Sequence, residues 1–548
     1  KRTFGAATAL LVIGLLVPAA AGPGGSKSCS VLDGRYDVGT QSWVEGIEAP
    51  GIAIVSASDR SVAFQVEDGY LLSGLCVRSG KTINTYQSDT TLPVEGPSTI
   101  TLTRSGPGYP LVSVSFDTEM ICEPAAQAPL TFEPPVFIDA HRDGGEPVSI
   151  VAEDGSLIAG AHLGTTLINP KTIPDPDWVT NYGNQTLVWR STDEGKTWQH
   201  IEFLPGSNMH SVSSTGFSDP DFAMDAGGNL YGTEIDLANV AVFSSHDNGQ
   251  TWPDANVVAD SGDRPWLAGR EDGVVYLRIT GNLQKSVDGG ATWTQLTDPP
   301  NAYGKLMADP TDPEGLFIPV NPSQGAGVVV SRDDGNTWTT YRVPGSKRID
   351  NTTITGVGVD SEGWVYEGYI QGTELKFSSW NPSTTEWSAP VTIPRTGSGS
   401  RLSWVWTVAG DAGRAAVGWY ELVPVTGQTN VFDIRPHIAV TENARGSTIG
   451  CPDGSSRSFE PSFSVSDAVG RAIYRGPQPC TGTGCNITGD RRLGDFFTIN
   501  FDQEGKVFLT TGDTTILGPA GQPNTQSHPL FSIATDSSPR LVAPGSTP

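Results

Sequence analysis

The chain has 548 residues, a formal net charge of −26, and 65 glycines and 41 prolines. The excess of acidic side chains argues against nucleic acid or an anionic membrane surface as a partner, because both require clustered Lys and Arg. We interpret the excess of acidic residues as a feature that keeps the protein soluble. Abundant Gly and Pro, with few segments of helical periodicity, are typical of turn-rich β structure.

Residues 1–21 have the pattern of a secretory signal peptide. Lys1 and Arg2 precede an apolar run, ALLVIGLLVPAAAG, that reaches small residues near Ala19–Ala21. This run is short for a membrane span, and no other stretch is apolar enough to cross a bilayer. We therefore expect a secreted, extracellular protein that has no membrane anchor after signal removal and is a monomer.

Six cysteines, an even number, predict disulfides in a secreted chain, and six allow 15 pairings. The pairs we favour are Cys76 with Cys122, Cys480 with Cys485 and, by remainder, Cys29 with Cys451. Metal binding is the lesser alternative, because no paired C-x-x-C spacing or His cluster accompanies these cysteines. We expect no cofactor and no metal site. Structural calcium stays an alternative in so acidic a chain, although no EF-hand spacing is present.

Three regions follow the signal segment. Residues 27–125 contain short alternating segments such as SVAFQV, TITLTR and LVSVSF between Gly, Pro and Ser, which predict a small β-sandwich. Residues 126–137 are rich in Pro and Ala and predict a linker. Residues 138–548 contain repeats.

Two motifs alternate in this last region. The first is an octapeptide, Ser-x-Asp-x-Gly-x-Thr-Trp, found as STDEGKTW (191–198), SHDNGQTW (245–252), SVDGGATW (286–293) and SRDDGNTW (331–338). The second is an acidic or turn residue, then Gly, then an apolar run, and its seven copies each predict a hairpin turn.

Together the two motifs describe a four-stranded unit, in which one hairpin is followed by a second that carries the octapeptide. Successive octapeptide tryptophans are 54, 41 and 45 residues apart. Four antiparallel strands at about this period are typical of a propeller blade. Seven hairpin turns favour seven blades, and six blades plus an extra hairpin is the alternative.

The octapeptide resembles the Asp-box, or bacterial neuraminidase (BNR) repeat, of secreted bacterial sialidase-like propellers. The resemblance covers roughly residues 140–540 and implies an all-β Asp-box propeller behind the N-terminal sandwich. In that family the box is the hairpin between the third and fourth strands of a blade. We expect each box aspartate to stabilise its own turn, because repeated turns normally serve the fold. These aspartates are Asp193, Asp247, Asp288 and Asp333.

Both turns of a unit lie at one end of its strands, so we seek ligand-binding residues at the other end, where each first strand begins. The segments there include GEPVSI (145–150), GDRPWLAG (262–269) and RLGDFF (492–497). The candidate catalytic residues are Glu146, Asp219, Asp263, Tyr420 and Asp495. The candidate substrate-binding residues are Arg264, Trp266, Lys305, Arg401, Trp404 and Arg492.

The resemblance to sialidases implies an arginine triad for the substrate carboxylate, a Tyr nucleophile assisted by Glu, and an Asp acid/base. This sequence departs from that pattern, since Gly145-Glu146-Pro147 stands where the family has Arg-Ile-Pro, and a glutamate there would repel an acidic sugar. Two functions follow. One is a glycoside hydrolase acting on an extracellular glycan or glycoprotein, and the other is a non-catalytic carbohydrate- or protein-binding propeller. A polysaccharide lyase is a lesser third alternative, because the chain has only seven histidines.

Overall fold

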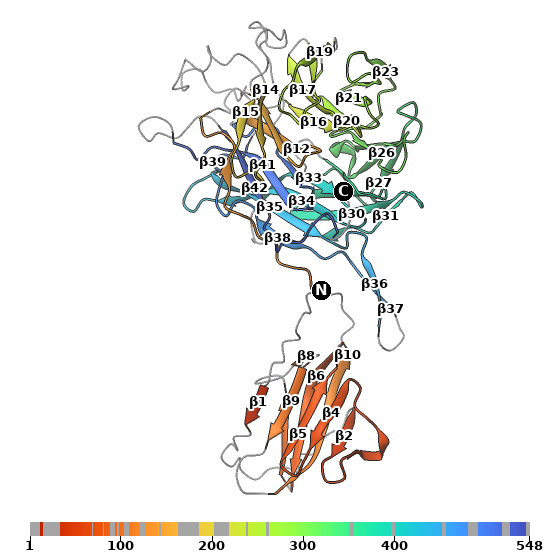
Figure 1. Cartoon of the computed structure of the whole chain (residues 1–548), viewed down its shortest axis with the longest axis vertical. Helices are drawn as coiled ribbons and strands as arrows, with labels where there is room; N and C mark the ends of the chain where they lie inside the picture. Colours follow the sequence, from red (N-terminus) through yellow and green to blue (C-terminus); the bar gives the residue numbers. More distant parts are fainter. Residues whose placement is uncertain are drawn as a thin grey trace. The chain divides into compact units, whose positions relative to one another are not determined.

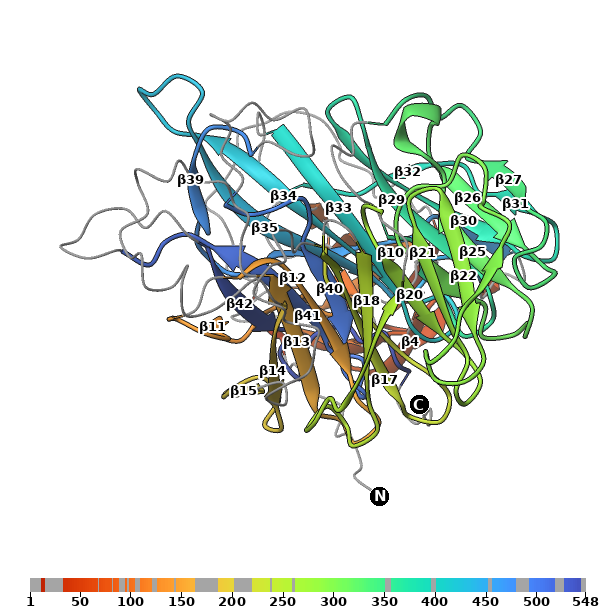
Figure 2. The same ribbon diagram turned by 90° about the horizontal axis from the view of Figure 1, so that it is seen from above.

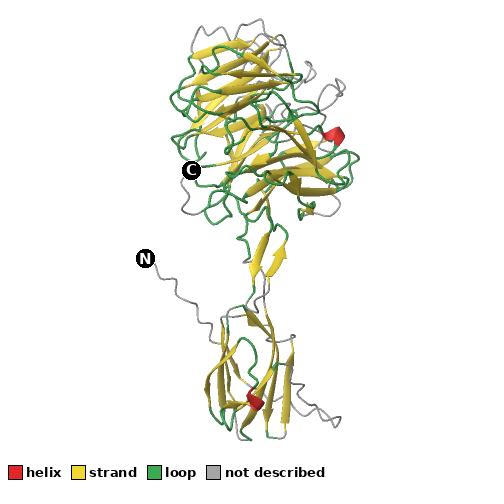
Figure 3. Ribbon diagram, turned by 90° about the vertical axis from the view of Figure 1, so that its right-hand side faces the viewer, coloured by secondary structure: helices red, strands yellow, loops and turns green. Residues whose placement is uncertain are grey.

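The computed structural model divides the chain into two compact units, Lys1–Ala125 with Ser447–Phe459, and Ala126–Gly446 with Glu460–Pro548 (Figure 1). The residues it describes are 11–14, 33–67, 69–80, 82–87, 94–95, 98–103, 109–120, 126–141, 144–162, 186–201, 219–236, 239–258, 262–349, 356–395, 401–451, 456–479, 492–517 and 527–543. Within these ranges the structure is all β, with two short 3-10 turns (Val44–Gly46 and Pro322–Gln324) and no α-helix (Figure 3). A membrane-spanning helix is likewise not found in this part of the chain.

The first unit is a β-sandwich, as predicted. One sheet has the order β1 (Leu11–Gly14), β9 (Ser98–Thr103), β5 (Ser61–Val66) and β4 (Ile52–Ala57). The other has the order β3 (Ser42–Trp43), β2 (Gly34–Asp37), β10 (Leu111–Met120), β6 (Tyr70–Ser79) and β7 (Thr82–Gln87), with β8 (Val94–Glu95) beside β6. SVAFQV becomes a strand because its alternate residues Val62, Phe64 and Val66 are fully buried in the core between the sheets.

A hairpin distant in sequence also belongs to the first unit. Its strands are β36 (Ser447–Gly450) and β37 (Ser456–Phe459), and Cys451 follows β36 directly. Cys76 and Cys451 are the two cysteines in the described ranges, and neither is free. The other four (Cys29, Cys122, Cys480 and Cys485) lie outside those ranges, so the favoured pairings stay predictions.

The second unit is built from antiparallel sheets, and in all of them except the last the strands follow one another in chain order from the first strand outward (Figure 2). The first four sheets are β12–β15 (Gly145–Val151, Leu157–His162, Thr186–Ser191, Gln199–Ile201), β16–β19 (Asp221–Met224, Leu230–Asp236, Asn239–Ser245, Asp254–Val258), β20–β23 (Trp266–Gly269, Val275–Ile279, Asn282–Ser286, Thr294–Leu296) and β24–β27 (Met307–Ala308, Leu316–Pro319, Gly327–Ser331, Thr339–Arg342).

Two five-stranded sheets and a four-stranded sheet follow. They are β28–β32 (Gly358–Val359, Val365–Gln371, Glu374–Asn381, Glu386–Trp387, Val391–Thr392), β33–β35 with β38 and β39 (Arg401–Ala409, Ala415–Pro424, Phe432–Thr441, Ser464–Asp467, Tyr474–Gly476), and β40–β42 with β11 (Thr498–Phe501, Val507–Asp513, His528–Ile533, Val136–Phe137). The described residues thus form seven sheets in this unit, a β-propeller architecture. The choice between seven and six blades stays a prediction.

Two names are used below for the ends of these sheets. The strand-start face is the end at which each first strand begins. The turn face is the opposite end, where each first strand meets its hairpin turn and where the octapeptide turns also lie.

The last sheet takes its outer strand from the beginning of the unit. Val136 in β11 pairs with Phe531 in β42, and Phe132 forms a bridge with Ala534. Residues 126–137, predicted as a linker, therefore contribute a strand. Joining the two ends of the unit in one sheet gives β42 a partner on its outer edge, which would otherwise be free to pair with another chain.

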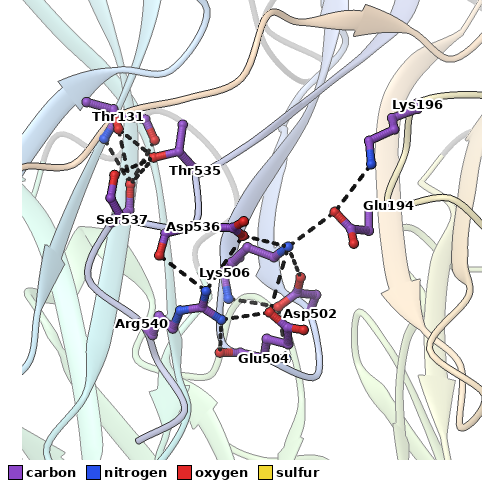
Figure 4. Close-up of polar contacts among 11 residues, drawn as sticks. Thr131, Glu194, Lys196, Asp502, Glu504, Lys506, Thr535, Asp536, Ser537 and Arg540 are labelled. Carbon is purple, nitrogen blue, oxygen red and sulfur yellow. Dashed lines mark hydrogen bonds and ion pairs between the residues drawn. The ribbon is translucent and has the colours of Figure 1, made fainter. Parts of the chain in front are cut away.

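A buried ammonium group ties the last sheet to the first on the turn face (Figure 4). The Lys506 side chain is 5% exposed, and its Nζ lies 3.3 Å from Glu194 Oε2, 3.5 Å from Asp502 Oδ2 and 3.4 Å from Asp536 Oδ1. Burial alone would lower the pKa of Lys506, but Asp502 and Glu194 raise it above its ordinary value. The carboxylates thus compensate a charge that would be costly to bury alone.

We expect Lys506→Met to destabilise the second unit by about 1–3 kcal/mol, because Asp502 loses the cation that compensates its own burial. Glu194 and Asp536 are 57% and 86% exposed, which keeps the effect below that of a fully buried pair. Urea unfolding followed by near-ultraviolet circular dichroism measures the loss. The control is Lys196→Met, because Lys196 is 72% exposed and lies 3.7 Å from Glu194. Equal losses in the two variants would contradict the assignment.

Candidate functional site

The four octapeptide turns share one set of hydrogen bonds. In the third copy, Ser286 Oγ and Thr292 N each donate to Asp288 Oδ1 at 2.8 Å, and Thr292 Oγ1 donates to Asp288 Oδ2 at 2.6 Å. The same three bonds recur at Asp193, Asp247 and Asp333. The bonds from Thr292 lower the pKa of Asp288 to about 2. Each aspartate thus uses its carboxylate within its own turn, on the turn face.

On the strand-start face, the first three sheets begin with the same unusual backbone shape. Glu146, Asp219 and Arg264 have φ values of 48°, 55° and 64°, and a proline follows each of them. Residues with side chains rarely adopt this left-handed region, and each instance costs on the order of 1 kcal/mol. The surrounding contacts must therefore hold these three residues in place.

Hydrogen bonds between neighbouring sheets supply those contacts. Glu146 Oε2 accepts from the Asp219 backbone N–H at 3.0 Å, and its Oε1 accepts from the Asp495 backbone N–H at 2.6 Å. Asp219 Oδ2 accepts from the Arg264 backbone N–H at 3.1 Å. These side chains connect the last, first, second and third sheets in order. We call Glu146, Asp219, Arg264 and Asp495 the strand-start cluster.

Arg264 completes the cluster with its side chain. Its Nη2 lies 3.2 Å from Asp495 Oδ2, and its Nε lies 3.4 Å from Asp263 Oδ2. The guanidinium carbon lies 5.0 Å from the centroid of the Tyr303 ring, a cation–π distance. The Asp263 side chain is 66% exposed, whereas the cluster itself is buried. Asp263 and Tyr303 therefore form its solvent-facing side.

Asp219 has an altered acidity. Burial, then the charge of Glu146 and the hydrogen bond with it, raise the pKa of Asp219 well above its ordinary value. Asp219 therefore keeps its proton at a pH where most aspartates are ionised. The cluster combines a proton donor, a carboxylate and a guanidinium group.

The structure places Tyr420, a candidate catalytic residue, in the core. Tyr420 is fully buried, its hydroxyl lies 2.5 Å from Thr511 Oγ1, and its ring stacks on Phe497 at a centroid distance of 4.5 Å. Burial raises the pKa of Tyr420, which opposes formation of a phenolate. Successive side chains of a strand point to opposite faces of the sheet, so the sequence predicts opposite directions for Tyr420 and Glu421 in β34. It does not predict how deeply either side chain is buried.

Two candidate substrate-binding residues, Trp266 and Trp404, are also core residues. Trp266 is 0% exposed and Trp404 is 1% exposed. Trp266 contacts Trp406 and Phe496, with ring centroids at 5.9 and 5.4 Å. Neither indole ring has a face exposed to a sugar, because core residues cover both rings.

Lys305 lies apart from the strand-start cluster, with a partner that the sequence reasoning missed. Its Nζ is 2.7 Å from Asp221 Oδ1 and 2.5 Å from Asp221 Oδ2. Asp221 follows Asp219 by two residues in SDPDFAM, and that second acidic residue was the available signal.

Two predicted arginines form a separate patch with aromatic rings that the sequence reasoning also missed. Arg401 lies 5.4 Å from the Phe432 ring centroid, and Arg492 lies 5.1 Å from the Tyr474 ring centroid. Phe432 and Tyr474 belong to the paired strands β35 and β39. Arg401 is exposed, and Arg492 is half-buried. We call these four residues the arginine–aromatic patch.

In the described part of the chain, no three His, Cys, Asp or Glu side chains are grouped so that they could hold a metal ion.

Comparison with known proteins gives structural similarity only. Neither a protein-family model nor a curated protein matches this chain. A Hadza microbial sialidase is 14% identical with a TM-score of 0.36, over 72% of this chain and 94% of that one. A NanB sialidase variant from Streptococcus pneumoniae is 13% identical with a TM-score of 0.33, over 88% and 89%. A Niastella koreensis GH74 enzyme is 14% identical with a TM-score of 0.37, over 72% and 62%. Similarities this distant carry no argument about activity, and the fold class rests on the sheets themselves.

The octapeptide turns predict acid sensitivity. Because the folded pKa of Asp288 is about 2 and its unfolded value is about 4, its stabilising effect is present above pH 4 and is lost as the pH falls toward 2. Asp288→Asn should remove this contribution, so that Tm falls less between pH 5 and pH 2.5 than in the unchanged protein. Scanning calorimetry across that range makes the comparison, and parallel Tm curves would contradict it.

Asp219→Asn should have the opposite pH signature. Since the folded pKa of Asp219 is raised, its stabilising contribution is present at low pH and is lost as the pH rises through the folded pKa. Asparagine keeps the shape without ionising, so the Tm of the variant relative to the unchanged protein should rise between pH 5 and pH 9. Glu386→Gln, at an exposed position on β31, is the control and should show a constant difference. A constant difference for Asp219→Asn would refute the buried, protonated state.

Proposed function

We propose that the protein is an extracellular, sialidase-like propeller that binds glycans on its strand-start face. The observation that carries the proposal is the arginine–aromatic patch, in which Arg401 and Arg492 lie against Phe432 and Tyr474. Guanidinium groups bind carboxylates through paired hydrogen bonds. The rings of Phe432 and Tyr474 are themselves buried, so they hold the guanidinium groups in place and do not contact a sugar. Arg401 is exposed, so an acidic sugar can reach it.

The strand-start cluster favours binding over hydrolysis. Glu146 already accepts two backbone N–H groups, and Glu146, Asp219 and Asp495 are at most 4% exposed. A glycosidase requires two carboxyl groups that flank the scissile bond, about 5 Å or about 6.5–9.5 Å apart. Glu146 and Asp219 instead interact directly with each other. Their geometry fits the joining of sheets better than attack on a glycoside.

Hydrolysis is the second candidate, and the raised pKa of Asp219 supports it. A carboxyl group perturbed by burial and by a charged neighbour is typical of catalytic acids. In this alternative, Asp219 donates its proton to the leaving oxygen, and Arg264 orients the sugar from its position beside Asp263 and Tyr303.

Binding to immobilised sialylated and neutral glycans tests the first candidate. We expect Arg401→Ala and Arg492→Ala each to weaken binding about tenfold or more, the loss of a charge-assisted contact. Lys196→Ala removes an exposed cation on the turn face and should leave binding unchanged. Equal loss in all three variants would indicate non-specific attraction and overturn the assignment of the patch.

A panel of fluorogenic glycosides separates the two candidates. Turnover that falls at least 100-fold in Asp219→Asn, the scale of a lost general acid, supports hydrolysis. Glycan binding without turnover supports a binding propeller. If the protein neither binds nor cleaves any member of the two sets, both candidates fail.

A further inference from the structure

The first strands of the second unit enclose a cavity of about 290 Å³. All seven sheets contribute to its wall, with strands β12, β16, β20, β24, β33 and β40 and with residues 356–357 just before β28. Its side chains are mainly apolar and include Leu267, Met307 and Val408. The cavity is therefore the central channel of the sheets.

The channel opens on the turn face. Leu267 and Leu306, in the part of the wall nearer the strand starts, are fully buried. Met224, Val408 and Phe501, nearer the first turns, are partly exposed. Solvent therefore reaches the cavity from the end opposite the strand-start cluster.

Aromatic rings close the inner end of the channel. Trp266, Trp406 and Phe496 contact one another, with ring centroids 5.4–6.2 Å apart. Trp266 lies in the chain between Arg264 of the strand-start cluster and Leu267 of the cavity wall, and Phe496 lies between Asp495 of the cluster and Thr498 of the wall. Trp406 itself lines the cavity. The cavity is thus separate from the face proposed to bind glycans.

One ion pair provides the polar group at this inner end. Lys305 Nζ contacts both Asp221 oxygens and also donates to the backbone oxygens of Phe222 at 3.2 Å and Leu267 at 3.3 Å. Both Lys305 and Asp221 line the cavity. A ligand carboxylate would be repelled by Asp221, and a ligand amine would be repelled by Lys305. The three N–H groups of Lys305 are already shared among these acceptors. A neutral hydroxyl group is repelled by neither charge and can donate to an Asp221 oxygen.

The volume limits the rest of the ligand. A dry engineered cavity of about 150 Å³ binds benzene, and this channel has about twice that volume. Binding pockets for small molecules are mostly apolar with a few polar groups that fix orientation, as here.

We propose that the central channel binds a neutral one- or two-ring molecule carrying a hydroxyl group, oriented by the Lys305–Asp221 pair. This site goes beyond the glycan-binding function, because it uses the opposite face and different residues. Loss of either function leaves the other measurable.

Isothermal titration of the full chain with 2-naphthol and with naphthalene tests the proposal. Ala409 lines the cavity at its partly exposed end, so Ala409→Trp should weaken both probes at least tenfold by filling the opening. The matched control is Ala412→Trp, at an exposed position in the adjacent turn, which should change neither affinity. If Ala409→Trp does not fold, as judged by circular dichroism, Ala308→Met narrows the same end by a smaller change.

A second variant tests the polar anchor. Lys305→Met combined with Asp221→Asn keeps the volume and the zero net charge of the pair but removes its charged acceptor together with the ammonium group. We expect 2-naphthol to bind about tenfold more weakly, the scale of one hydrogen bond to a charged group, and naphthalene to bind as before.

The proposal is overturned if neither probe binds, which leaves a water-filled channel. It is equally overturned if Ala409→Trp and Ala308→Met leave both affinities intact, or if both probes lose affinity equally in the anchor variant.

Discussion

The pairing of β11 with β42 is the contact on which the second unit depends. Each sheet buries its apolar faces only against neighbouring sheets, so a row of sheets without closure would leave two faces in water. Pairing Val136 with Phe531 brings the two ends of the sequence of this unit into one sheet. The Lys506 network and the bonds of Glu146 then join the first and last sheets at opposite ends of their strands.

Much of this fold can be predicted from the residues that form its turns. The octapeptides and the Gly-containing hairpin turns predict the four-stranded units, and the all-β class is confirmed. Val136–Phe137 was not predictable as a strand, because two residues that follow two prolines show no alternation and their partner in β42 is nearly 400 residues away. Long-range pairing of so short a segment is fixed by closure and not by local preference.

The sequence indicates which residues lie together in the candidate site, but not how deeply they are buried. The starts of the first strands do bring Glu146, Asp219 and Arg264 together with Asp495, since equivalent positions in a ring of sheets converge. Burial could not be foreseen, because alternation along a strand shows which face a side chain takes and not what covers it. For the same reason Trp266 and Trp404 seemed open to a ligand, although both are core residues.

The position of the hairpin β36–β37 in the sequence affects the order in which the two units can be completed during synthesis. Ser447–Phe459 belongs to the first unit, although six of the seven first strands of the second unit precede it. A ribosome therefore releases most of the second unit before the first can be complete, contrary to the usual order in which an N-terminal domain finishes first. A fragment that ends at residue 125 lacks this hairpin, and one that begins at residue 126 carries it without the rest of the first unit. Neither unit is a contiguous segment of the chain, so evolution cannot exchange either of them by a single cut and join.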